Sequence, residues 1–191
     1  LYIADLDNRR IRRIDMKTRI VTTYAGNGAK GVPQDGSPAA ESPLLDPRAV
    51  AAAPDGSVFI LERSGNVLRR VNAAGRIVTV VGTGKKGAAL GDGSPKQVEL
   101  NGPKHLCIEK HDKTYSVLIA DTENHRILRY SFDKTEKVEL IAGTGKKGVH
   151  LVDADPLKSE LSQPHGVAVH PKTGEIYIAD SSNNRILKIE T

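Results

Sequence analysis

The sequence predicts an all-β protein assembled from repeated four-stranded units, and three observations lead to this prediction. A phrase of the form Ile-Ala-Asp-x-x-Asn-x-Arg-Ile begins at positions 3, 119 and 178, and a degraded copy begins at Ile60. The acidic residues of the four copies, Asp5, Glu62, Asp121 and Asp180, are 57, 59 and 59 residues apart. Short runs rich in β-branched residues alternate with turn-forming residues, and no stretch has a sustained helical period.

Composition narrows the class of protein further. The 191 residues carry a net charge of +5, and 38% of them are hydrophobic. No apolar run approaches the roughly 20 residues that a membrane span needs, so the sequence predicts no membrane-spanning segment. The single cysteine, Cys107, excludes an internal disulfide, and its apolar strand favours a small core residue over a nucleophile.

Two kinds of loop recur at about the same spacing as the repeated phrase. Glycine-rich segments occur at 26–28, 82–84 and 143–145. Asp-Gly-Ser-Pro follows at 35–38 and 92–95, with a looser echo at 155–156. An N-cap residue type stands before a proline in each of these loops, which predicts one helical turn beginning at Pro38, Pro95 and Pro156.

Each complete unit is expected to contain four strands. The first strand follows Pro47, Pro103 or Pro164, and the fourth precedes the glycines, as in 77–81 and 138–141. The chain therefore divides into a partial blade (1–43), two full blades (44–99 and 100–160) and a second partial blade (161–191). Four-stranded units at a fixed period are typical of a β-propeller, in which each blade packs between neighbours. About 3.3 repeats cannot close a ring, so we expect missing blades or a second copy to complete it.

The repeated phrase and the segment Pro164-His165-Gly166-Val167-Ala168-Val169 resemble NHL repeats. The glycine-rich loop followed by Asp-Gly-Ser-Pro resembles the long-loop variety frequent in bacterial NHL proteins. This resemblance covers essentially the whole chain and implies a propeller that has six blades in most of the family. It also favours a secreted or periplasmic location, although no signal sequence is visible in these residues.

The polar residues of the phrase are interpreted as structural, because catalytic residues need not recur in every blade. We expect each aspartate to accept backbone N–H bonds at a strand end, each asparagine to occupy a left-handed turn, and Arg126 and Arg185 to pair with the aspartates. These structural positions are Asp5, Asn8, Asp121, Asn124, Arg126, Asp180, Asn183 and Arg185.

Two other motifs are set aside. The runs at 26–31, 82–87 and 143–148 spell Gly-x-Gly-x-x-Gly but lack the following helix of a dinucleotide site. Paired lysines recur at 85–86 and 146–147, where they predict a basic rim that nearby acidic residues offset. With 4% aromatic residues and no tryptophan, the chain has few stacking platforms, which does not favour nucleic acid as the partner.

The candidate ligand site lies where the first strand of each unit begins. Arg48, Lys104 and His165 each follow a repeat proline and are expected at the mouth of the central channel, with His105 one residue later. Fixed cations in a concave mouth attract anions, and His165 should add charge mainly below about pH 6.5. The resemblance extends to an NHL-like amidating lyase whose zinc is held by histidines at these positions. Only one of the three is histidine here, so no metal site is predicted.

The sequence thus favours a non-catalytic NHL propeller scaffold that binds a protein, a peptide or a small ligand, including an anionic one. The sequence shows no complete combination of catalytic residues, and no cofactor is predicted. Two alternatives stay open. One is a metal-dependent lyase- or lactonase-like propeller enzyme, with zinc or calcium and with active residues partly in other blades. The other is RNA binding.

Overall fold

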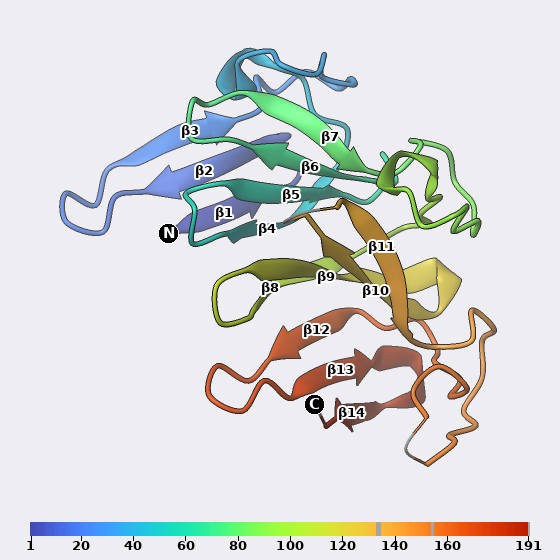
Figure 1. Ribbon diagram of the computed structural model, residues 1–191. Helices are drawn as coiled ribbons and strands as arrows, with labels where there is room; N and C mark the ends of the chain where they lie inside the picture. Colours follow the sequence, from blue (N-terminus) through green and yellow to red (C-terminus); the bar gives the residue numbers. More distant parts are fainter. Residues whose placement is uncertain (133–134, 154, 191) are drawn as a thin grey trace.

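The computed structural model describes residues 1–132, 135–153 and 155–190 and shows four antiparallel sheets that follow one another in chain order (Figure 1). The first sheet has three strands and the second has four: β1 (Tyr2–Asp5), β2 (Arg10–Ile14), β3 (Val21–Ala25); β4 (Pro47–Ala52), β5 (Val58–Glu62), β6 (Val67–Val71), β7 (Ile77–Val81). The third has four strands and the last has three: β8 (His105–Lys110), β9 (Tyr115–Asp121), β10 (Arg126–Ser131), β11 (Lys137–Ala142); β12 (Gly166–Val169), β13 (Ile176–Asp180), β14 (Arg185–Ile189).

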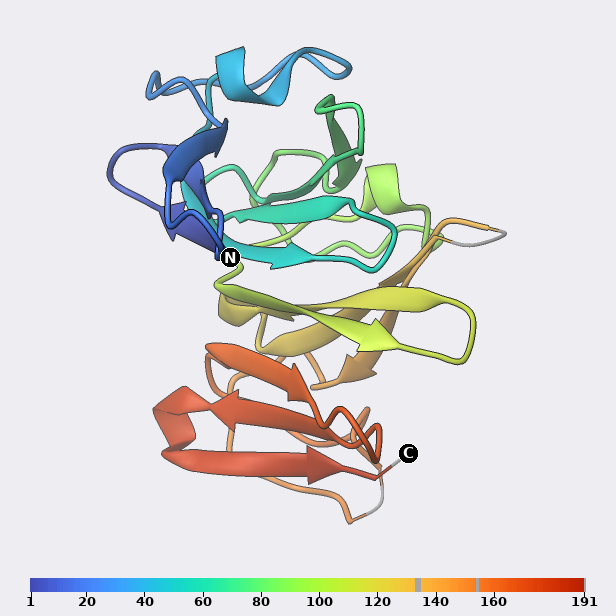
Figure 2. The same cartoon turned by 90° about the vertical axis from the view of Figure 1, so that its left-hand side faces the viewer.

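This order of three, four, four and three strands confirms the predicted all-β class and strand tally. Within each sheet the strands pair with their neighbours in sequence, as expected of propeller blades. The sheets are stacked side by side, with the two three-stranded sheets at opposite ends of the stack (Figures 1 and 2). The inner strands β4, β8 and β12 are neighbours in space, so the residues that begin them come together at one end.

The core lies between the sheets, because alternate residues of a strand point to opposite neighbours. In β5, Ile60 packs in a cluster with Ile11 and Ala25 of the preceding sheet. Phe59 and Leu61 pack in another cluster that includes residues of the following sheet. All five residues of β5 are buried, and each fully buried large apolar side chain contributes about 1.5–3 kcal/mol to stability. A blade is therefore stabilised mainly by its neighbours.

A helical turn forms in two of the three loops for which one was predicted. A 3-10 turn, η2, covers Pro95–Gln97 with its proline in the first turn, as expected. In the first loop the turn η1 covers Ala39–Glu41, so Pro38 is the N-cap residue instead of the first helical residue. Residues 156–158 form a turn without a helix. Two further 3-10 turns, η3 (Thr122–Asn124) and η4 (Ser181–Asn183), were not predicted and follow the repeat aspartates directly.

Candidate functional site at the start of the inner strands

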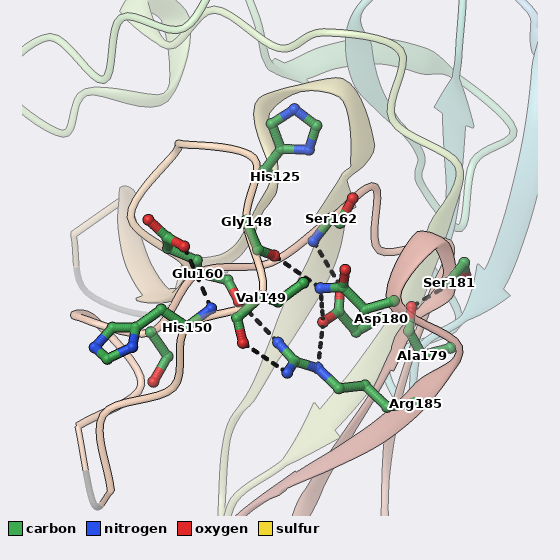
Figure 3. A network of polar contacts seen from close by, with 12 residues as sticks. His125, Gly148, Val149, His150, Glu160, Ser162, Ala179, Asp180, Ser181 and Arg185 are labelled. Atoms are coloured by element: carbon green, nitrogen blue, oxygen red, sulfur yellow. Dashed lines mark hydrogen bonds and ion pairs between the residues drawn. The ribbon is translucent and has the colours of Figure 1, made fainter.

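In the third and fourth sheets the repeat residues form a buried clamp of one aspartate, one asparagine and one arginine. Asp180 accepts hydrogen bonds from the Ser162 N–H, Asn183 Nδ2 and Arg185 Nε at 2.6, 2.7 and 2.7 Å (Figure 3). Asp121 accepts the same three kinds of bond, from Asn101, Asn124 and Arg126. Both aspartates are fully buried, so their carboxylates serve the fold and are closed to a ligand.

The arginine of each clamp holds the long glycine-rich loop against the sheet. Arg185 donates its terminal nitrogens to the carbonyls of Val149 and Glu160, at 2.8 and 3.1 Å (Figure 3). Arg126 does the same with the carbonyls of Ala88 and Glu99. Each of these long loops is therefore fixed by a side chain of the repeat phrase.

The expectation that the repeat asparagines occupy left-handed turns is wrong. The left-handed residue is the next one along the chain, namely Arg9, His125 and Asn184, with φ of 50°, 51° and 52°. Asn124 and Asn183 lie in the turns η3 and η4, where each amide donates both to the clamp aspartate and to a loop carbonyl.

The first two backbone amides of each glycine-rich loop are hydrogen-bonded within the loop. The N–H of Gly82 donates to the Pro95 carbonyl, and the N–H of Gly143 donates to the Pro156 carbonyl, both at 2.9 Å. The next residue in each loop, Thr83 or Thr144, donates to another carbonyl of the same loop. Because a phosphate cradle needs such donors directed at the ligand, the loops fit a structural role. The paired lysines beside them are exposed.

Lys104 and His165, from the third and fourth sheets, meet at the start of the inner strands. Lys104 Nζ lies 2.8 Å from His165 Nε2, although 61 residues separate them in sequence. An ammonium group can only donate, so Nε2 accepts and the proton of the neutral ring is on Nδ1. Burial, and then the charge of Lys104, lower the pKa of His165 below its ordinary value. His165 therefore gains its charge at lower pH than the expected value of about 6.5.

Arg48 and His105 complete this group. His105 Nδ1 accepts the N–H of Val167 at 3.4 Å, so the proton of its neutral ring is on Nε2. Burial lowers the pKa of His105, and the positive charge of Arg48 adds to this effect. Arg48 also lowers the pKa of His165, and it lies on β4, the inner strand that contacts β8. Arg48 is exposed, and within residues 1–132, 135–153 and 155–190 its side chain makes no hydrogen bond or ion pair.

Glu123 belongs to the same group and was not predicted from the sequence. Its Oε1 lies 3.8 Å from Lys104 Nζ, and its Oε2 accepts a hydrogen bond from Gln163 Nε2 at 2.9 Å. Glu123 occupies a variable position of the repeat phrase, which is Asp7 in the first copy and Ser182 in the last. No regular signal marked it, because the residue type at this position changes from copy to copy and its contact with Gln163 joins two different sheets.

The geometry does not suit a metal at the positions of the zinc-binding lyase. Arg48 and Lys104 are cations, and Lys104 already occupies the Nε2 nitrogen of His165 that a metal would need. In the part of the chain that the structure describes, no three His, Cys, Asp or Glu residues gather closely enough to hold a metal ion. No described helix combines the length and apolar character of a membrane span.

Comparison with known proteins identifies the family. The family model described as the Teneurin NHL domain matches residues 18–191. The chain is 26% identical over 215 residues to NHL repeat-containing protein 2 of Gallus gallus, covering all of this chain and 29% of that protein. It is 28% identical over 190 residues to Teneurin-m of Drosophila melanogaster, covering 90% of this chain and 6% of that protein. The chain thus spans less than a third of these relatives.

Solved structures agree on the fold. An auxiliary nutrient binding protein from Bacteroides thetaiotaomicron superposes with a TM-score of 0.73 at 20% identity, over 98% of this chain and 44% of that one. A gluconolactonase from Xanthomonas campestris gives a TM-score of 0.66 at 14% identity, over 100% of this chain and 54% of that one. At these identities the likeness concerns the fold alone.

Proposed function

The chain belongs to the NHL-repeat family represented by the Teneurin NHL domain, and from this premise we propose that it is a rigid, non-catalytic recognition scaffold. Its ligand is bound where the inner strands begin, by a group that we call the mouth cluster: Arg48, Lys104, His105, Glu123 and His165. The ligand carries an anionic oxygen group, such as that of a small molecule or of an acidic residue in a protein or peptide.

One observation carries this proposal. Arg48, Lys104 and His165 stand at or beside the start of the neighbouring inner strands β4, β8 and β12, and Lys104 Nζ lies 2.8 Å from His165 Nε2. In the third and fourth sheets the aspartate, asparagine and arginine of the repeat phrase are engaged in the clamps. Each member of the mouth cluster except Glu123 offers an N–H donor or a positive charge. A guanidinium binds a carboxylate bidentately, and an ammonium adds a compact charge. The nutrient-binding relative in structure is consistent with a binding role for the fold.

The experiment is a titration of the full chain with acetate, followed by NMR of the imidazole resonances. We expect acetate to shift the His105 and His165 signals in the parent protein and to leave them unshifted in the Arg48→Ala/Lys104→Ala variant. Lys85→Ala/Lys86→Ala is the matched control, since it removes the same charge from an exposed loop. Equal responses in both double variants would refute the mouth cluster as the binding site.

A propeller enzyme of the lyase or lactonase type is the second candidate, because the gluconolactonase shares the fold. The described residues of the mouth cluster do not form a metal cage, so a metal-dependent enzyme would depend on residues in other blades. Stoichiometric zinc or calcium in the purified full chain would favour it.

A further inference from the structure

The charges of the mouth cluster do not add up to those of a simple cationic pocket. Arg48 and Lys104 are positive, but Glu123 lies 3.8 Å from the Lys104 ammonium and is negative. Lys104 is only 18% exposed and Glu123 is 37% exposed, so the pair is partly shielded from water and screening by salt is incomplete. The fixed charges therefore sum to about +1.

The two imidazoles supply hydrogen bonds without adding charge. His165 is kept neutral because a second proton would place two donors, Nε2–H and the Lys104 ammonium, against each other. His105 accepts the N–H of Val167 and is neutral for the same reason. Burial lowers the pKa of both rings. The charge of Arg48 lowers both pKa values further, and at His165 Lys104 lowers the pKa while Glu123 raises it. Each ring then carries one N–H, at Nδ1 of His165 and at Nε2 of His105.

We propose that Glu123 sets the charge selectivity of the mouth cluster, which prefers a singly charged oxyanion, in a biological ligand a carboxylate, to a dianion. This inference rests on the proposed function, because it concerns the same site. A monoanion neutralises the net charge of +1 and can accept from the guanidinium and from neutral N–H donors. A second negative charge would face the Glu123 carboxylate and lose its hydration without a compensating cation.

Gln163 fixes Glu123 in place. Its Nε2 donates to Glu123 Oε2, while Ser182 donates its hydroxyl to Gln163 Oε1 at 2.8 Å. The carboxylate is therefore oriented by a chain of hydrogen bonds from the fourth sheet. Glu123→Gln keeps an amide oxygen as an acceptor for Gln163 and removes only the charge, so it isolates the electrostatic role.

The test compares two small tetrahedral sulfur oxyanions that differ in charge, methanesulfonate (one negative charge) and sulfate (two). Affinities for the full chain are measured at constant ionic strength and pH 7.5 from the His105 and His165 resonances. We expect the parent protein to bind methanesulfonate at least as tightly as sulfate. In Glu123→Gln the ratio should shift toward sulfate by roughly three- to tenfold. The matched control Glu139→Gln, an exposed acid elsewhere on the third sheet, should leave the ratio unchanged.

The outcomes separate this inference from the proposed function. If neither anion moves the histidine signals, the mouth cluster is not a binding site and both proposals fail. If both anions bind at the mouth but the parent protein prefers sulfate, or if Glu123→Gln leaves the ratio unchanged, the proposed function stands. The assignment of Glu123 as the selectivity residue is then overturned.

Discussion

Arg69 Nε lies 2.7 Å from Glu62 Oε2, and the two side chains are 2% and 0% exposed. The pair lies in the repeat that departs most from the common phrase, where valine occupies the position of the clamp arginine. Arg69 comes two residues later and also donates to Thr79 Oγ1. The first sheet uses the same alternative, because Arg12 donates to Asp5 and to Thr23. The degraded copy thus keeps an acid–arginine pair, with the arginine supplied from a different position of the repeat.

The buried Glu62–Arg69 pair should show strong energetic coupling. Arg69→Met leaves a buried carboxylate without its cation and should reduce the free energy of unfolding by about 3–5 kcal/mol. Glu62→Gln/Arg69→Met removes both charges and should cost clearly less than the sum of the single changes. Urea denaturation of the four proteins measures the cycle. Additivity within about 0.5 kcal/mol would contradict the expected coupling.

Removing a clamp aspartate should destabilise the protein far more than removing an exposed acid. In Asp121→Ala the Arg126 guanidinium, 6% exposed, loses its counterion, and we expect a loss of about 3–5 kcal/mol in the free energy of unfolding. Glu139→Ala breaks an exposed pair with Lys137 and should cost about 0–1 kcal/mol. Chemical denaturation compares them, and similar losses would show that the clamp contributes little.

The first glycine of each long loop is required for space as well as for its backbone angle. Gly143 has φ of +91°, and a Cβ there would lie 2.3 Å from the His125 carbonyl oxygen. Gly56 has φ of +84° but no atom within 4 Å of such a Cβ. Gly56→Ala should cost about 1–2 kcal/mol, from backbone strain alone. Gly143→Ala should cost about 1–3 kcal/mol more than Gly56→Ala in the free energy of unfolding, because its Cβ also overpacks the site. Equal shifts of the thermal midpoint would refute the steric argument.

Stability should decrease as the pH falls below about 6.5, the ordinary pKa of histidine. His125 Nδ1 accepts the N–H of Gln163 at 3.0 Å, and burial lowers the pKa of His125. The unfolded chain therefore takes up a proton at higher pH than the folded chain, and protonation favours unfolding in this range. Stabilisation by the neutral ring is complete above pH 6.5 and is lost as the pH falls through the folded pKa.

The variant His125→Asn tests this account. Asn66 occupies the corresponding position in the second repeat, where its Oδ1 accepts the N–H of Gly102 at 3.0 Å. Asparagine at 125 should therefore keep an acceptor for Gln163 without a titrating group. We expect the urea midpoint to change less between pH 5.5 and 7.5 in the variant than in the parent protein. An unchanged pH dependence would assign the effect to other groups.

Cys107 should be unreactive while the protein is folded. Burial raises the pKa of its thiol to about 12, so little thiolate is present at pH 8. An unfolded cysteine has a pKa near 8.5, and its alkylation by iodoacetamide should be more than a hundredfold faster. Mass spectrometry with and without denaturant measures both rates. Rapid modification of the folded protein would show that the thiol is accessible.

The sequence by itself determined the architecture, because the information for it is local and repeated. The regular spacing of Asp5, Glu62, Asp121 and Asp180 marks one equivalent strand in each sheet, namely β1, β5, β9 and β13. The strand before it begins at or just after Pro47, Pro103 or Pro164 in the last three sheets. Strand pairing follows chain order within each blade, so the three-four-four-three tally could be predicted without knowing any contact between blades. Hydrophobic alternation and turn residues act over a few positions, and the sequence shows them directly.

Only the tertiary structure decided which polar groups meet across blades. The 2.8 Å contact of Lys104 with His165 and the hydrogen bond from Gln163 to Glu123 join residues from different repeats. The sequence predicted Arg48, Lys104 and His165 at one opening, but the hydrogen bond between Lys104 and His165 and the approach of Glu123 to Lys104 depend on distances of a few ångströms in the folded chain. Coulomb and hydrogen-bond energies vary steeply over such distances, and no spacing along the chain encodes them.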